Sequence, residues 1–272
     1  MITHNGKYLL HATHHGMPIY AATMGGKMVI GGWLLSATLQ AIVAAFGAVE
    51  GGEVIVKTND YLNAIAATDP ARAQRLAGFI NEDPLLVTSL VETSKTRWLV
   101  GDGKSWIEVA FPITTDDYIK WVEDNKETSS SFQPIFATAP TYTYAHWINN
   151  TKGIFAIGGQ ESGQFDLSQG VHIVEKKADK WFLDGVQKQQ RTMAYTKYDS
   201  FKLFDWCGST SRASNSAMQM FQIGELPTLL LAPCYTKAQG NGMLDIISGT
   251  FYPNANTQGS FTIALTDKQP TQ

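Results

Sequence analysis

Paired acidic residues are the first side chains in this 272-residue sequence whose spacing could support chemistry. The segment Glu123-Asp124-Asn125-Lys126-Glu127 comes nearest to the arrangement of sandwich-type glycosidases, where one carboxylate is the nucleophile and another is the acid. In a strand, however, Glu123 and Asp124 would face opposite sides, and Asn125 stands where the middle acid belongs. We therefore expect no glycoside hydrolysis from this segment.

Two other catalytic motifs are incomplete. The run Gly101-Asp102-Gly103-Lys104-Ser105 ends like a phosphate-binding loop, but Trp98 stands where the first glycine is required, and the chain after it has the texture of a strand. The sequence has no Gly-x-Ser-x-Gly elbow, and neither Cys207 nor Cys234 has a histidine nearby along the chain. The sequence therefore favours a protein that is not an enzyme and needs no cofactor.

Candidate metal ligands are explained as well by ordinary structure. Two cysteines 27 positions apart cannot form a thiolate zinc site or a disulfide framework. Four of the six histidines lie near the N-terminus without a carboxylate close by in sequence, and three aspartates could bind calcium at loop tips, although Asp-Gly is also the usual hairpin signal. These residues are His4, His11, His14 and His15, and Asp102, Asp184 and Asp205. We expect no metal site.

Aromatic side chains offer a third kind of chemistry, because exposed rings stack on the apolar faces of sugars. They make up 11% of the chain, with seven tryptophans. The candidate carbohydrate-binding residues are Tyr142, Tyr144, Trp147 and Trp181. The alternative is that alternating aromatic residues fill the core of a sandwich.

The composition of the chain limits the kinds of partner that it can bind. Charged residues form only 17% of the chain, the net charge is −3 and the isoelectric point is near 6.1, so the sequence carries no basic footprint for nucleic acid. The N-terminus lacks the pattern of an export signal. No charge lies between Lys27 and Glu50, but glycine and polar residues interrupt that interval and no basic cluster flanks it, so we expect no membrane span.

The elements that would carry these residues change along the chain. Short apolar runs and turn signals predict a β-meander in residues 1–33, an anchoring part. Residues 34–94 form a helical linker. Its apolar residues step by four and three, a seam that predicts a helix for oligomerisation ending at Gly51-Gly52. Asp69-Pro70 and Asp83-Pro84 each predict the start of a further helix. The seam consists of Leu35, Leu39, Ile42, Phe46 and Val49.

Residues 95–268 have the texture of strands throughout. Aromatic and β-branched runs alternate with Gly, Asn and Asp turns about every ten residues, a pattern typical of jelly rolls. The predicted fold class is mainly β, with a C-terminal two-sheet antiparallel jelly-roll sandwich, an N-terminal β-meander and a small helical region.

The sequence near the C-terminus resembles that of a known domain family. The run from Leu231 to Cys234, followed by Gly242 to Asn254, resembles the closing strands of concanavalin A-like (LamG/laminin-G-like) jelly-roll domains in virion proteins of phages and prophages of gut bacteria. Two further stretches agree, Gly103 to Ile107 and Trp181 to Gly185. The chain departs from the family pattern at Leu244, where tyrosine is usual, and at Asn256-Thr257-Gln258-Gly259, where a Gly-Thr-Gly turn is usual.

The resemblance implies a bacteriophage virion protein assembled in the host cytoplasm, in a tail, fibre, baseplate or capsid decoration. Its expected partners are other virion proteins, further copies of itself in a homo-oligomer such as a trimer, and a host-surface glycan. Two alternatives stay open. One is a bacterial carbohydrate-binding surface protein, which needs an export signal, and the other is a glycoside hydrolase, which needs acidic residues that converge in a cleft.

Overall fold

The computed structural model describes most of the chain from residue 48 onward and six short strands before it. The described residues are 2–4, 7–9, 13–14, 17–18, 21–24, 27–30, 48–91, 94–125, 132–138, 144–149, 152–157, 160–167, 169–192, 194–205 and 213–267. Strands dominate them, and the named pairings between strands are antiparallel. The predicted fold class is confirmed.

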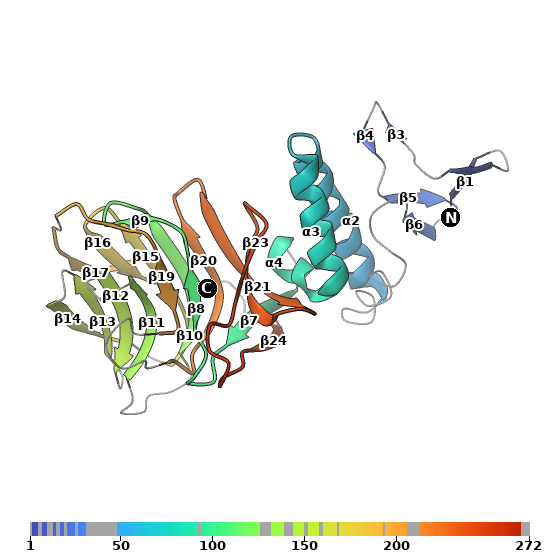
Figure 1. Cartoon of the computed structure of the whole chain (residues 1–272). Helices are drawn as coiled ribbons and strands as arrows, with labels where there is room; N and C mark the ends of the chain where they lie inside the picture. The colour runs from blue at the N-terminus through green and yellow to red at the C-terminus, as the bar shows by residue number, and fades with distance from the viewer. Residues whose placement is uncertain are drawn as a thin grey trace. The chain divides into compact units, whose positions relative to one another are not determined.

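The chain forms two compact units, which are described separately (Figure 1). The first unit comprises residues 1–97, 235–237 and 266–272. The second unit comprises residues 98–234 and 238–265.

The described N-terminal strands of the first unit pair as three consecutive hairpins, in the region where the sequence predicts a β-meander. The hairpins are β1 (Ile2–His4) with β2 (Lys7–Leu9), β3 (Thr13–His14) with β4 (Met17–Pro18), and β5 (Ala21–Met24) with β6 (Lys27–Ile30). Their pairing repeats every ten residues, since Thr3 pairs with Tyr8, Thr13 with Pro18 and Thr23 with Met28. The segment is thus a threefold repeat of one short hairpin.

Helix α2 (Ala48–Ala66) is the first helix of the first unit that the structure describes, and the apolar seam before it lies mostly outside the described residues. The helix runs through Gly51-Gly52, so the prediction that these glycines end a helix is wrong. Glycine lowers helix stability by only about 1 kcal/mol, which a long helix can absorb. Helix α3 (Pro70–Glu82) begins as predicted, with the Asp69 carboxylate accepting a hydrogen bond from the Arg72 amide at 2.9 Å.

Asp83 precedes two short helical turns, η1 (Pro84–Leu86) and α4 (Val87–Leu90), but its side chain does not cap them. Its buried carboxylate instead pairs with the buried Arg97 guanidinium and accepts a hydrogen bond from the Tyr235 amide at 2.6 Å. A buried charge is tolerated only when it is paired in this way. The sequence correctly predicted that helical structure begins at Pro84, but the predicted capping role of the Asp83 side chain is wrong. None of the described helices has the length and apolarity that a membrane span requires.

The second unit is a sandwich of two antiparallel sheets (Figure 1). The larger sheet has the order β17-β16-β15-β10-β20-β21-β22-β23, with β7 beside β20 and β24 beside β7. The smaller sheet has the order β14-β13-β12-β11-β19-β8, and β9 pairs with β18. The bounds are β7 (Lys95–Val100), β8 (Ile107–Val109), β9 (Ile113–Thr114), β10 (Ile119–Asn125), β11 (Phe132–Thr138), β12 (Tyr144–Asn149), β13 (Lys152–Ile157), β14 (Gln160–Asp166), β15 (Gly170–Lys177), β16 (Lys180–Leu183), β17 (Val186–Gln190), β18 (Lys197–Tyr198), β19 (Phe201–Leu203), β20 (Ala217–Ile223), β21 (Leu229–Thr236), β22 (Gly240–Asp245), β23 (Thr250–Pro253) and β24 (Thr262–Asp267).

Aromatic rings from both sheets fill the core between them. Trp121 on β10 lies 5.9 Å from Phe221 on β20 and 6.0 Å from Phe136 on β11, measured between ring centroids. Every second residue of β10 is buried, because successive side chains of a strand point to opposite faces. The Asp-Gly hairpin predicted at Asp184-Gly185 is confirmed, since both residues have positive φ, as a type I′ turn requires.

Candidate functional site

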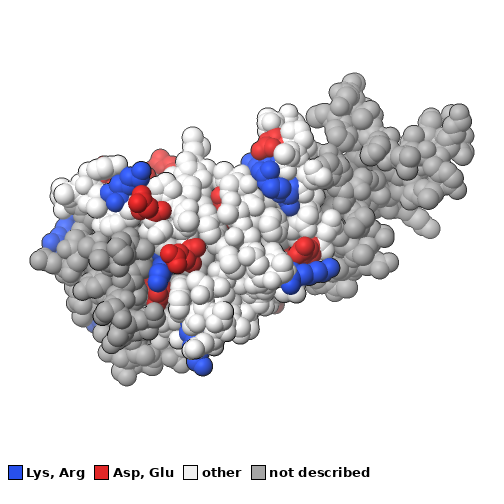
Figure 2. Space-filling view, viewed as in Figure 1, with Lys and Arg blue, Asp and Glu red and all other residues white. Residues whose placement is uncertain are grey.

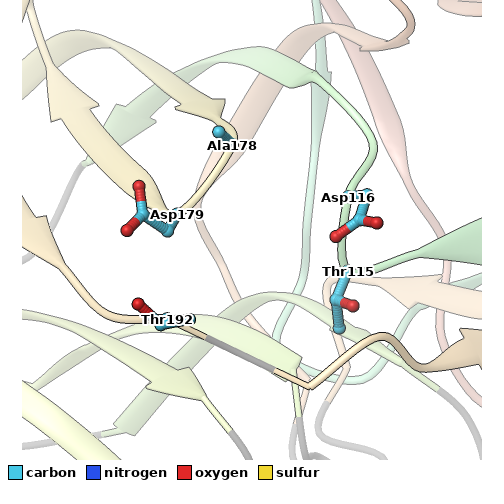
Figure 3. A pocket seen from close by; sticks show the side chains of 5 residues that line it. All are labelled: Thr115, Asp116, Ala178, Asp179 and Thr192. Carbon is cyan, nitrogen blue, oxygen red and sulfur yellow. The ribbon is translucent and has the colours of Figure 1, made fainter.

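A pocket of about 260 Å³ lies where three loops of the sandwich meet (Figure 3). Its lining residues come from the β9–β10 turn, the β15–β16 turn and the segment after β17. They are Thr115, Asp116, Ala178, Asp179 and Thr192. Ligand pockets for drug-sized molecules measure about 300–1,000 Å³, so this one suits a smaller group such as a single sugar ring.

The β9–β10 turn holds its side of the pocket through local hydrogen bonds. The Asp117 carboxylate accepts from the Thr114 amide at 2.6 Å, and the Asp116 amide donates to the Thr114 hydroxyl at 3.3 Å. Such side-chain bonds to nearby backbone are the usual way that Asp and Thr fix a turn. They leave the exposed Asp116 carboxylate beside the cavity (Figure 3).

The β15–β16 turn holds the opposite side. Ala178 has a φ of 50°, a left-handed conformation that costs a residue with a Cβ roughly 1–2 kcal/mol. The Asp179 carboxylate accepts from the Gln190 side-chain amide at 3.0 Å, and its carbonyl accepts from the Arg191 amide at 2.9 Å. The turn is therefore fixed in place although its backbone is strained.

A buried lysine lies beneath both turns. The Lys176 ammonium donates hydrogen bonds to the backbone carbonyls of Thr115 and Asp117, the latter at 2.9 Å. Burial lowers the pKa of Lys176 to about 8, although Asp117, Asp116 and Asp179 act in the opposite direction. The lysine thus ties the turns together and places a positive charge close to the carboxylates.

The segment after β17, which supplies the third wall, is tied to Thr115 and contains an exposed aromatic residue. The Thr115 hydroxyl donates to the Ala194 carbonyl at 3.1 Å and accepts from the Thr196 amide at 3.0 Å. Tyr195, between these two residues, has 66% of its surface exposed. The segment that supplies Thr192 therefore also presents a tyrosine ring to solvent.

This arrangement suits a ligand that is rich in hydroxyl groups. Carboxylates accept hydrogen bonds from hydroxyls, threonine hydroxyls donate and accept, and an aromatic face packs against sugar C–H groups. No cluster of three or more His, Cys, Asp or Glu side chains within the described residues could hold a metal ion. Charged groups lie scattered on the visible, largely uncharged surface (Figure 2).

Of the four aromatic residues predicted to bind sugar, Trp181 has a described side chain, and it does not line this pocket. Trp181 is completely buried in the core, where its ring lies 6.1 Å from that of Trp121, so it offers no face to a sugar. For this residue the alternative, core packing, is correct. Tyr144 and Trp147 lie on β12, but their side chains fall outside the described part of the structure, as does Tyr142 entirely.

The predicted oligomerisation seam also lies outside the described part. Leu35, Leu39, Ile42 and Phe46 belong to it, and only the backbone of Val49 is described, within α2. The N-terminal histidines have no described side chains either.

The three aspartates considered as calcium ligands have structural partners instead. The Asp102 carboxylate accepts hydrogen bonds from three backbone amides, the Asp184 carboxylate binds the His172 ring at 2.8 Å, and the buried Asp205 binds the Lys202 ammonium at 3.0 Å. Burial raises the pKa of Asp102, but the amides of Ser260, Lys104 and Ser105 outweigh it and the pKa is lowered.

Glu123, from the incomplete glycosidase motif, lies between the two sheets. It is fully buried, one carboxylate oxygen accepts from the Trp121 indole at 2.7 Å, and the other lies 3.4 Å from Nε2 of the buried His146. Asp124 points to the other face of β10, as the sequence predicted. This cluster is sealed from solvent and serves the core.

Sequence reasoning missed Asp116, Asp179 and Tyr195. The signal that could have found Tyr195 is its polar setting, because an aromatic residue in a run without apolar alternation has no core face to join. Asp116 and Asp179 gave no such signal, since each stands in an ordinary polar turn.

No protein-family model matches the chain, and no curated protein matches it either. Among solved structures, a candidate carbohydrate-binding protein from Bacteroides ovatus is similar over 64% of this chain and 60% of its own, with a TM-score of 0.44 and 13% identity.

Domains LG4–5 of the mouse laminin α1 chain are similar over 50% of this chain and 43% of theirs, with a TM-score of 0.34 and 11% identity. A mutant sialidase of Trypanosoma rangeli that displays trans-sialidase activity is similar over 42% and 20%, with a TM-score of 0.31 and 9% identity. The chain spans less than two thirds of each of these structures. The sandwich architecture of the second unit follows from its own strand pairing.

Proposed function

We propose that the sandwich binds carbohydrate, without transforming it, at the pocket between Thr115, Asp116 and Asp179. One observation carries the proposal: two carboxylates and two threonine side chains line a cavity of about 260 Å³, and the exposed Tyr195 follows the lining residue Thr192 by three positions along the chain. Few polar groups that converge in a concavity are the usual mark of a binding site. Fixed turns preorganise these groups, which lowers the entropic cost of binding.

The test is binding to a glycan array followed by titration calorimetry with the glycans that bind. Asp116→Asn, Asp179→Asn and Tyr195→Ala are each expected to weaken binding by about tenfold, which corresponds to one lost hydrogen bond or stacking contact of about 1.4 kcal/mol. Asp60→Asn on helix α2 and Leu226→Ala on an exposed turn are the matched controls. Binding that survives all three pocket substitutions would contradict the proposal.

We further propose that the protein is a component of a bacteriophage particle, located in the tail, fibre, baseplate or capsid decoration. The resemblance of residues 231–254 to the closing strands of phage jelly-roll domains supports this placement. The protein would assemble in the host cytoplasm with other virion proteins, as a homo-oligomer, and bind a glycan of the host surface.

Mass spectrometry of purified particles, with an antibody to residues 95–265 in negative-stain images, tests the placement. Detection at defined positions on the particle is the expected result. Absence from particles together with recovery in a host surface fraction would favour a bacterial carbohydrate-binding surface protein instead.

A second candidate function is glycoside hydrolysis, and one observation favours it. Asp116 and Asp179 line the same pocket, which is the convergence of two acids that such an enzyme needs. Release of reducing ends from a bound oligosaccharide, abolished by Asp116→Asn or Asp179→Asn, would establish hydrolysis. Binding without release supports the carbohydrate-binding function.

A further inference from the structure

The acidic and basic groups around the pocket differ in whether a ligand in the cavity can contact them. Asp116 and Asp179 both line the cavity, and none of the five lining residues is basic. Figure 3 shows their carboxylates on opposite sides of the opening. A ligand that enters therefore meets two negative groups directly.

The nearest buried cation does not reverse this field. Lys176 is fully buried, and its ammonium donates to the carbonyls of Thr115 and Asp117 rather than into the cavity. The neighbouring Lys177 is directed elsewhere, since its ammonium lies 5.8 Å from the centre of the Tyr118 ring, 5.7 Å from that of Phe182 and 3.5 Å from the Glu175 carboxylate.

We infer that the pocket selects sugars by charge: it takes neutral or amino sugars and rejects uronic and sialic acids. This inference rests on the proposed carbohydrate-binding function and names the substrate class of the same site. Neutral sugars supply hydroxyl donors to both carboxylates, and an amino sugar adds an ammonium. A sugar carboxylate would bring a third negative charge to a site that offers it no cationic lining residue.

Matched glycan pairs test the inference, because the acidic member of each pair carries carboxylates that the neutral member lacks. The probes are oligogalacturonates against their methyl esters, cello-oligosaccharides against the same chains oxidised to carboxylates at C6, and sialylated against desialylated galactosides. The neutral member of the pair that binds is expected to bind at least tenfold more tightly at low salt. The ratio should shrink at high salt, since exposed charges are then screened.

Variants separate charge from shape. Asp116→Asn combined with Asp179→Asn keeps the size of the side chains and removes both charges, so the preference for the neutral member should fall to about one. Asp60→Asn, which removes one exposed charge on helix α2, should leave the preference unchanged.

The outcomes distinguish the two proposals. Equal or tighter binding of the acidic member by the wild-type protein would overturn the charge selection and leave the carbohydrate-binding function standing. Binding of no member of any pair, and of no glycan on the array, would overturn the function and the inference with it.

Discussion

The sandwich contains two clusters of ionisable side chains that are built from similar groups and lie in opposite surroundings. Glu123 and His146 are sealed between the sheets, and both oxygens of the carboxylate face hydrogen-bonding partners. Asp116 and Asp179 lie on turns at the edge of a cavity, above a buried lysine. We call the first pair the closed cluster, and the second pair together with Lys176 the open cluster.

The difference between the two clusters shows which polar groups remain able to bind a ligand. A buried polar group must complete its hydrogen bonds within the protein, because an unmet one costs about 1–3 kcal/mol. The hydrogen-bonding groups of the closed cluster are already used within the protein, where they stabilise the fold. The open cluster presents carboxylates to a cavity, so hydrogen bonds to a ligand can still form there.

The largest expected effect comes from breaking the closed cluster. Glu123→Leu leaves the buried Trp121 indole without its acceptor and the buried His146 without its carboxylate, so the free energy of unfolding should fall by about 3 kcal/mol. Urea unfolding measures it, with Glu108→Leu on the exposed side of β8 as the control. A loss below about 1 kcal/mol would show that the closed cluster does not support the core.

The next effect concerns the lysine of the open cluster and depends on pH. Because burial lowers the pKa of Lys176 from 10.5 to about 8, the folded state binds fewer protons than the unfolded state between these values. The free energy of unfolding should therefore rise with pH in this window, by at most about 1.4 kcal/mol per pH unit.

Lys176→Met should remove this part of the pH dependence. Urea unfolding of the wild type and the variant at pH 7, 8, 9 and 10 gives the difference between their free energies of unfolding. The contributions of the other titrating groups cancel in this difference. One of these is Tyr118, whose pKa burial and the bond to Glu175 raise. Parallel curves for the two proteins would contradict the prediction.

A smaller effect is expected at the strained turn of the open cluster. Ala178→Gly relieves the left-handed backbone but increases the entropy of the unfolded chain, so the net gain in stability should be about 0.5 kcal/mol. Ala194→Gly, at an exposed position without positive φ, should instead reduce stability. Thermal unfolding of the two variants compares them, and a loss at Ala178 would argue against strain there.

The smallest expected change in stability comes from the exposed Asp116 carboxylate of the open cluster, which lines the cavity. Asp116→Asn should leave the free energy of unfolding within about 0.5 kcal/mol of the wild type, as is usual for exposed positions. Its effect should appear in glycan binding alone. A large loss of stability would place Asp116 among the residues that support the fold.

Local signals in the sequence predicted the fold well and the site poorly. The Asp-Gly hairpin at 184–185 and the Asp69 cap were predictable because each depends on neighbouring residues. The pocket was not, because Thr115 is far in sequence from Asp179 and Thr192 and meets them only through the pairing of β10 with β15 and of β9 with β18.

Trp181 shows a second limit of the sequence. Alternation revealed that every second residue of β16 shares a face, but not whether that face meets the other sheet or solvent. The opposing sheet decides this, and its position depends on contacts across the whole chain. The same pattern therefore fitted both a sugar-binding ring and a core ring.

The ten-residue period of the N-terminal hairpins has a consequence for how this segment can vary in length. Since Thr3, Thr13 and Thr23 each pair with the residue five positions later, removing residues 12–21 or duplicating them would keep the pairing offset of the remaining hairpins. An insertion whose length is not a multiple of ten residues would shift the strands out of this pairing register. Recombination, or a protein engineer adding a tag, could thus lengthen the segment in steps of ten residues without changing the register of its hairpins.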